Sequence, residues 1–165
     1  MRTVFIALRA LVFATGFFLV WGWVALGVRV YDRRLGIVLP EVAVGPGIVL
    51  MALGALLALT CVGVFVVEGR GTAAPFDAPR QFVARGPYRY LRNPMYVGGW
   101  VLLVGFGLYQ RSAAILVFSV VWIGLAHLFV ILYEEPNLRR RFGAAYENYC
   151  KAVPRWILRS HLPGK

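Results

Sequence analysis

The stretch MYVGGWVLLVGFGLY-QR-SAAILVFSVVWIGLAHLFVILY, residues 95–133, decides the fold because only two polar residues separate its two apolar runs. A connection as short as Gln110–Arg111 joins antiparallel neighbours, so the stretch predicts a helical hairpin. The run 112–133 can cross a hydrocarbon core of about 30 Å at about 1.5 Å per residue. The run 95–109 is short for a crossing. We therefore expect it to recruit loop residues or to begin within protein.

Two more apolar blocks precede this hairpin, at residues 4–28 and 46–67. The chain is 60% hydrophobic with a mean hydropathy of +0.70, above the roughly 45–50% of soluble domains. These blocks predict an all-α integral membrane bundle of four transmembrane helices, forming one domain over residues 1–165. The block 4–28 begins like a signal peptide, but it is longer than a signal core and has no clear cleavage site. We expect an uncleaved first span.

The net charge of +11 lies mainly in the connections between apolar blocks. That placement favours contact with anionic lipid head groups and disfavours nucleic acid. Two crossings separate the connection before residue 95 from the C-terminal tail, so both lie on one side. The positive-inside rule predicts that this side is cytoplasmic, with both termini. The connection carries Arg70, Arg80, Arg85, Arg89 and Arg92, and the tail carries Arg139, Arg140, Arg141, Lys151, Arg155, Arg159 and Lys165. The opposite side keeps Arg29, Arg33, Arg34 and Arg111. The Arg-, Ala-, Val- and Gly-rich usage favours a bacterial inner membrane.

The tail after residue 133 has a helical hydrophobic pattern. Leu138, Phe142, Tyr146 and Tyr149 recur at the spacing of one helix face, with arginines largely off that face. The pattern predicts one amphipathic helix lying along the cytoplasmic interface. Pro154 should end it.

The segment RGPYRYLRNP, residues 85–94, brings charge and rigid turns to the membrane surface. Pro87 suits the first position of a short helical turn, and Asn93–Pro94 should break the chain so that a span begins at Pro94. The free N–H groups of that helix start, with Arg92 beside them, can hold an anionic group. A positive-inside stop signal with interfacial tyrosines explains the same residues, and both explanations stay open here.

Glu134 and Glu135 lie at the predicted end of the fourth span, before Pro136. Adjacent carboxylates there oppose the helix dipole and repel each other, so a cation should offset them. The candidates are Arg92, Arg139, Arg140 or a positively charged ligand. Because the hairpin is tight, the glutamates and the turn at Arg92 should meet at one end of it, forming a candidate site.

Several other residues have a structural explanation beside a functional one. His127 shares a face with Glu134, yet a lone membrane histidine is more often a hydrogen-bonded packing residue. Small residues at helix-contact spacing, Gly54 with Ala58 and Gly98 with Gly105, predict close helix packing. Gly105 and Gly107 could also admit a flat ligand to the backbone.

The two cysteines, Cys61 and Cys150, are interpreted as packing residues. With His127 and His161 they do not form a zinc motif, so no metal is expected.

Three ordered motifs carry a family resemblance: GPYRYLRNPMYVGG at 86–99, GFG at 105–107 and YEEPNLRRRFGAAYENYCKAVPR at 133–155. Together they resemble the isoprenylcysteine carboxyl methyltransferase and phospholipid methyltransferase group, integral membrane enzymes that use S-adenosylmethionine. The resemblance covers about residues 85–155. It implies a cofactor enclosed at the cytoplasmic end of the bundle, with Arg92 and Glu135 as catalytic residues. The implied cofactor-binding residues are Tyr90, Arg92, Asn93, Pro94, Tyr96, Gly98, Gly105, Gly107, Glu134, Glu135, Tyr146 and Tyr149. The closing tail matches at Leu138, Phe142, Gly143, Tyr146, Tyr149, Pro154 and Arg155.

One position departs from that family. Asn93 stands where the isoprenylcysteine enzymes typically have histidine, and asparagine cannot titrate near neutral pH. A base at this position is therefore in doubt, while a role in holding the cofactor remains.

The expected function is methyl transfer from S-adenosylmethionine to a lipophilic or amphipathic acceptor, such as an isoprenylcysteine carboxylate, a phospholipid amine or a small thiol. The expected partners are this substrate and membrane lipids, without nucleic acid. Two alternatives are a small membrane transporter or assembly protein, and a member of the same fold with altered catalysis. The central parts of the apolar blocks carry no Asp or Glu, which counts against ion-coupled transport.

Overall fold

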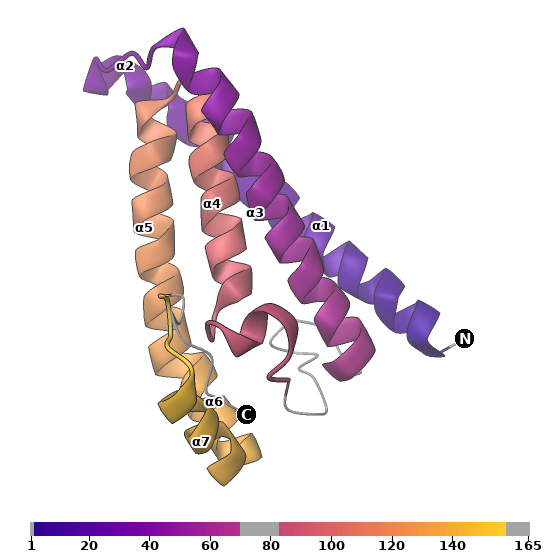
Figure 1. Ribbon diagram of the computed structural model, residues 1–165. Helices are drawn as coiled ribbons and strands as arrows, with labels where there is room; N and C mark the ends of the chain where they lie inside the picture. The colour runs from indigo at the N-terminus through magenta and orange to yellow at the C-terminus, as the bar shows by residue number, and fades with distance from the viewer. Residues whose placement is uncertain (1, 70–82, 158–165) are drawn as a thin grey trace.

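The computed structural model describes residues 2–69 and 83–157, and this part of the chain is helical apart from turns and one isolated bridge between Val38 and Ser112. The all-α prediction is confirmed. Figure 1 shows α4 with α3 and α5 on either side of it, while the N-terminal half of α1 extends away from α4 and α5. The α-helices are α1 Arg2–Val28, α2 Asp32–Leu35, α3 Val44–Val64, α4 Pro94–Tyr109, α5 Ala113–Phe129, α6 Glu135–Phe142 and α7 Ala144–Ala152. The shorter turns are η1 Arg29–Tyr31, η2 Glu41–Ala43, η3 Phe65–Gly69, η5 Gly86–Arg89 and η6 Val130–Glu134.

Among the residues that the structure describes, three helical stretches are long and apolar enough to cross a membrane: Ala7–Leu35, Glu41–Val67 and Ala113–Phe142. The shorter apolar helix is Pro94–Tyr109, which corresponds to the run expected to be short. Large apolar side chains on these stretches, including Leu19, Val120 and Leu132, are well exposed. An apolar surface of this extent is typical of lipid contact. The chain is therefore a membrane protein. Its described residues contain three helices of spanning length and one shorter apolar helix, and the expected count of four crossings stays a prediction.

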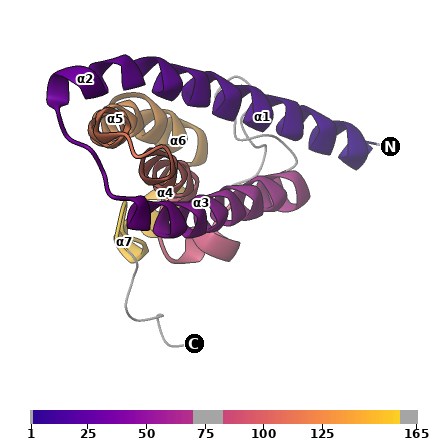
Figure 2. The ribbon, with the colours of Figure 1, turned by 90° about the horizontal axis from the view of Figure 1, so that it is seen from above.

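Helices α3 and α4 are in backbone contact. A Cβ atom added to Gly54 of α3 would lie 2.5 Å from the backbone nitrogen of Leu102 in α4. One added to Gly105 of α4 would lie 2.6 Å from the backbone nitrogen of Met51. Only glycine permits this approach, so the predicted small-residue contacts are confirmed. Seen from above, α4 and α5 lie between α1 and α3 (Figure 2).

The tip of the α4–α5 hairpin is held by the connection after α1. Arg111 adopts a positive φ of 53° in the turn, and its Nε donates to the carbonyl oxygen of Leu39 at 2.8 Å. The first turn of α5 is capped twice. Ser112 Oγ accepts from the Ile115 amide at 3.1 Å, and Asp32 Oδ1 accepts from the Ala114 amide at 2.8 Å. The predicted antiparallel hairpin is confirmed, and these contacts fix its tip.

The fourth apolar run does not end at residue 133. The chain continues from α5 through η6, a π-helical turn that is wider than an α-helical one, into α6. Ala113–Phe142 is therefore one helical stretch. Pro136 lies in the first turn of α6, directly after the wide turn. Proline has no backbone N–H to donate, and a wider, π-helical turn lets the helix continue past it. The prediction that the glutamates lie at a helix C-terminus was therefore wrong, because Glu134 ends η6 and Glu135 begins α6.

The tail was predicted as one amphipathic helix, and this too was wrong. Gly143 separates α6 from α7, with φ 51° and ψ −128°, a conformation that side-chain-bearing residues rarely adopt. Leu138 and Phe142 therefore lie on α6, while Tyr146 and Tyr149 lie on α7. Pro154 follows the end of α7 as expected.

The two polar segments lie at the same end of the bundle. Figure 1 shows η5, α6 and α7 at the end opposite α2 and the hairpin tip. The shared side predicted for residues 85–94 and the tail is confirmed for the described residues. Four of the basic residues used in that prediction lie outside them, namely Arg70, Arg80, Arg159 and Lys165.

Candidate functional site at one end of the hairpin

The turn before α4 forms as the sequence predicts. Pro87 lies in the first turn of η5, and Pro94 is the first residue of α4. Asn93, between them, has φ −122° and ψ 51°, outside helical geometry. Arg92 is therefore held two residues before the start of α4, where it faces the other end of the hairpin.

The Glu135 carboxylate is almost fully buried, at 3% exposure, and is surrounded by arginines. Its Oε1 accepts from Arg92 Nη1 at 3.0 Å and from Arg155 Nε at 2.7 Å. Its Oε2 accepts from Arg155 Nη2 at 3.0 Å and lies 3.6 Å from Arg139 Nη2. The predicted cations Arg92 and Arg139 thus offset this glutamate, while the third candidate, Arg140, bonds to Asn137.

Arg155 is the site residue that sequence reasoning did not place. Its bond to Glu135 raises the pKa of its guanidinium, which stays a permanent cation. The carboxylate is already satisfied by guanidinium groups of the chain itself. Glu135 consequently organises the arginines and does not need a cationic ligand. The only signal for Arg155 in the sequence was that it matches the closing tail of the methyltransferase group that the sequence resembles.

The tail lies across the turn before α4 and is tied to it by hydrogen bonds to backbone carbonyl oxygens. The Arg92 amide donates to the carbonyl oxygen of Pro154 at 2.9 Å. Asn93 Nδ2 donates to the carbonyl oxygen of Arg155 at 3.2 Å, and the Tyr149 hydroxyl donates to that of Tyr88 at 2.7 Å. Asn93 is buried. Its amide therefore supports the tail at the position where the isoprenylcysteine enzymes typically have histidine.

Glu134 has a different environment from its neighbour. Its Oε2 accepts from the Tyr96 hydroxyl at 2.9 Å, and within residues 2–69 and 83–157 no cation pairs with it. Close by, Arg92 Nε is buried, and no acceptor for it is found in the described part of the chain. The site thus retains one carboxylate without a cation and one cationic donor without an acceptor. This pair suits a ligand that carries both an ammonium and a carboxylate.

His127 has the structural role. Its Nδ1 accepts from Trp156 Nε1 at 2.9 Å, which fastens the tail to α5. The Trp156 ring also lies 6.4 Å from the Tyr96 ring, edge to face. The packing explanation of His127 therefore fits the geometry, and Trp156 is a second tail residue that sequence analysis did not single out.

The glycines predicted to bind cofactor lie in helix contacts. Gly98 and Gly105 face α3, where a Cβ on Gly98 would already meet Ala58 and Gly54 backbone at 3.0 Å. Gly107 faces α5, where a Cβ would lie 2.8 Å from Leu116 Cδ2. Their space is filled by protein, so the packing explanation fits them.

The remaining predicted residues differ in position. Tyr90 is exposed after η5, whereas Tyr146 is buried and its ring centroid lies 6.1 Å from that of Tyr149, with the two rings tilted by 41°. The structure therefore brings together Arg92, Asn93, Pro94, Tyr96, Glu134 and Glu135, with Tyr149 tied to the same turn. It does not bring Tyr90, Gly98, Gly105 or Gly107 to this centre.

The cysteines do not form a metal site in the described part of the chain, which holds no cluster of metal-ligating residues. Cys61 is buried and Cys150 is partly buried, and both are free thiols. Cys150 Sγ lies 3.1 Å from Arg92 Nη1, so it packs against the arginine cluster.

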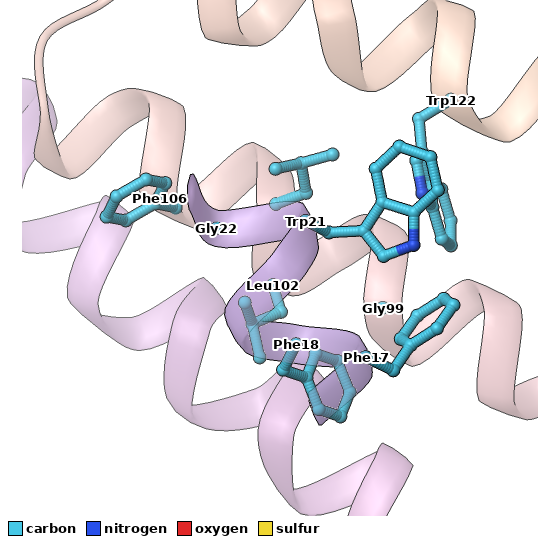
Figure 3. Close-up of a pocket in the computed structure, with 9 residues that line it drawn as sticks. Phe17, Phe18, Trp21, Gly22, Gly99, Leu102, Phe106 and Trp122 are labelled. Carbon is cyan, nitrogen blue, oxygen red and sulfur yellow. The ribbon is translucent and has the colours of Figure 1, made fainter. Parts of the chain in front are cut away.

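An apolar cavity of about 200 Å³ lies beside this centre (Figure 3). Its aromatic wall consists of Phe17, Phe18 and Trp21 from α1, Phe106 from α4 and Trp122 from α5. The Trp122 ring is 6.5 Å from that of Tyr96, whose hydroxyl donates to Glu134. The cavity was not predicted. Its only sequence signal is the aromatic spacing at residues 17, 18 and 21.

Comparison with known families identifies a family match. The model of a family described as phospholipid methyltransferase matches residues 42–145. No curated protein and no solved structure matches the chain. The matched region contains Arg92, Tyr96, Glu134 and Glu135, whereas α1 and Arg155 lie outside it.

Proposed function

Since the chain belongs to the phospholipid methyltransferase family, we propose that it transfers a methyl group from S-adenosylmethionine to a lipophilic or amphipathic acceptor at the cytoplasmic surface of the membrane. Family membership makes the chain a methyltransferase that acts on lipid-like substrates. The single observation that carries the finer proposal is found at one end of the hairpin, where, within the described residues, the Glu134 carboxylate has no cation partner and Arg92 Nε has no acceptor.

S-adenosylmethionine would supply an activated methyl group on a sulfonium, together with an ammonium, a carboxylate and ribose hydroxyls. Glu134 suits the ammonium or the hydroxyls, and Arg92 Nε suits the carboxylate. Tyr96 holds the Glu134 carboxylate by its hydrogen bond. Glu135 fixes Arg92 from the other side. In this proposal Glu135 therefore acts through Arg92, as a positioning residue.

The contribution of the chain in this proposal is orientation. Well-oriented reactants gain up to about 7–11 kcal/mol from proximity alone. Asn93 does not titrate near neutral pH, and its amide is engaged with the Arg155 carbonyl, so proton removal at this position is not part of the proposal. An acceptor carboxylate, amine or thiol is compatible with that role. Which of these atoms accepts the methyl group depends on the substrate.

The arrangement in the membrane is part of the same proposal. We place both polar segments and both termini in the cytoplasm of a bacterial cell, with α4 as a fourth, short crossing and the whole chain as one domain. The co-location of η5, α6 and α7 at the arginine-rich end supports this placement. In that orientation α6 and α7 lie at the cytoplasmic interface.

The test uses the full chain purified in detergent. Calorimetry with S-adenosylhomocysteine measures cofactor binding, and transfer of a radiolabelled methyl group into a membrane lipid extract, with mass identification of the product, measures activity. We expect both binding and a labelled lipid. Absence of binding contradicts the proposal, and binding without any labelled product contradicts methyl transfer. Glu147→Gln, at an exposed glutamate on α7, is the control variant and should behave as the wild type.

A further inference from the structure

The apolar cavity between α1, α4 and α5 has a defined direction, and we call it the aromatic slot. Along α4 its lining runs from Gly99 to Phe106. At a rise of about 1.5 Å per residue, it begins roughly 4.5 Å beyond Tyr96 and ends roughly 15 Å beyond it. The slot therefore starts one helical turn beyond Tyr96, whose hydroxyl donates to Glu134, and extends along α4 away from the polar end.

The chemistry of the slot favours an apolar occupant. Its walls are aromatic and aliphatic side chains with two glycines, Gly22 and Gly99, and a buried polar group would find almost no partner there. Its volume of about 200 Å³ is below the range of about 300–1,000 Å³ typical of sites that enclose a whole ligand. It is suited to part of one slender hydrocarbon chain, with the rest of the molecule elsewhere.

We infer that the aromatic slot holds the hydrocarbon chain of the methyl acceptor, whose reactive end then lies at Tyr96 and Glu134. This inference rests on the proposed function and deepens it by naming the substrate class: an amphiphile that inserts one slender chain and carries a small polar end. A second chain, where the lipid has one, stays in the bilayer. Trp122 joins the two parts, because it lines the slot and packs near Tyr96.

The wall contributed by α1 lies outside the region that matches the family. The family match begins at residue 42, so Phe17, Phe18 and Trp21 lie outside it. Phe17 and Trp21 meet Trp122 edge to face at 6.4 Å and 6.0 Å. Figure 3 shows these rings around the open space together with Gly22. The first helix thus supplies one wall of the slot, while the matched region supplies its other walls together with Tyr96 and Glu134.

A pair of matched substitutions on α1 tests the inference. A Cβ added to Gly22 meets nothing within 4 Å, so Gly22→Leu can fold and fill the slot that this residue lines. Gly16 lies on the same helix, and a Cβ there also meets nothing within 4 Å, but it does not line the slot. Gly16→Leu is therefore the control. The probe is a single-chain fatty amine with a photoreactive diazirine at mid-chain, and its crosslinks are mapped by mass spectrometry.

We expect crosslinks in the wild type at Trp21 and at residues 102–106 of α4. In Gly22→Leu they should fall by about tenfold, which corresponds to about 1.4 kcal/mol of binding, and in Gly16→Leu they should persist. Equal labelling of the two variants, or wild-type labelling spread evenly over lipid-facing surfaces, overturns the inference. Binding of S-adenosylhomocysteine is measured on the same samples and should be equal in all three. Its absence from the wild type would refute the proposed function, whereas the crosslinks report on the slot.

Discussion

Arg92 and Glu135 form an ion pair of 3.0 Å across 43 residues of chain. The pair joins the turn before α4 to the first residue of α6, and it closes the end of the hairpin opposite the tip. Arg155, from the tail, pairs with the same carboxylate at 2.7 Å. Three segments far apart in the sequence are therefore held at one buried carboxylate, and the stability of this end depends on it.

Replacing Glu135 should destabilise the protein strongly. Glu135→Gln leaves the arginines clustered without their counter-charge, and removing one partner of a buried pair typically costs about 3–5 kcal/mol. The unfolding midpoint in a denaturant titration should fall accordingly, and cofactor binding should weaken with it because Arg92 loses its support. Glu147→Gln removes an exposed pair with Arg139, worth about 0–1 kcal/mol. Equal midpoints for the two variants would show that Glu135 does not organise this end.

Replacing Glu134 should affect binding and leave stability nearly unchanged. Within the described residues no cation depends on this carboxylate, and glutamine can still accept from the Tyr96 hydroxyl. We expect Glu134→Gln to weaken S-adenosylhomocysteine binding by about tenfold, or about 1.4 kcal/mol, in calorimetry. The unfolding midpoint is the control measurement on the same sample. Unchanged affinity would remove Glu134 from the proposed cofactor site.

The meeting of Arg92 with Glu135 could be predicted because it follows from local rules. A two-residue connection forces α4 and α5 to be antiparallel, and the Asn93–Pro94 break sets where α4 begins. Arg92, just before α4, and Glu135, beyond the end of α5, must then lie at the same end of the hairpin. A buried carboxylate requires a cation beside it, so charge alone reduced the candidate partners of Glu135 to three arginines or a positively charged ligand.

The course of the chain after Glu134 could not be predicted from the same rules. Pro136 suggested a helix end, but the wide turn η6 carries the helix past it. The return of Arg155 and Trp156 to α4 and α5 depends on long-range contacts that no periodicity encodes. Gly143 offered a signal in the sequence, because glycine suits the positive φ that separates α6 from α7. The prediction of one helix followed the regular spacing of apolar residues on both sides of Gly143 and therefore missed this break.

Adding a methyl group between α3 and α4 should be costly. A Cβ on Gly54 would lie 2.5 Å from a backbone nitrogen, which cannot rotate away as a side chain can. Forced overpacking of this kind costs about 1–3 kcal/mol, so Gly54→Ala should lower the unfolding midpoint. Gly63→Ala, on the same helix, places its Cβ in open space and should leave the midpoint unchanged or slightly higher. A midpoint in Gly54→Ala equal to that of Gly63→Ala would contradict the direct backbone contact.

The tail should loosen at alkaline pH through Tyr149. Burial raises the pKa of the Tyr149 hydroxyl above its ordinary value near 10, and the neutral group donates to the Tyr88 carbonyl. The unfolded chain therefore loses this proton at lower pH than the folded chain. The stabilising contribution is fully present below about pH 10 and is lost as the pH rises further, by up to about 1.4 kcal/mol per pH unit.

Tyr149→Phe separates this effect from general alkaline unfolding. Near neutral pH the variant should be less stable by about 0.5–1.5 kcal/mol, since the hydrogen bond to Tyr88 is lost. Above about pH 10 its stability should decline less steeply than that of the wild type, so the two curves converge. Tyr90→Phe, at an exposed tyrosine after η5, is the control and should follow the wild-type curve. A group with the same pKa in the folded and the unfolded chain does not make the free energy of unfolding depend on pH. Parallel curves for Tyr149→Phe and the wild type would therefore mean that ionisation of this hydroxyl does not weaken the tail.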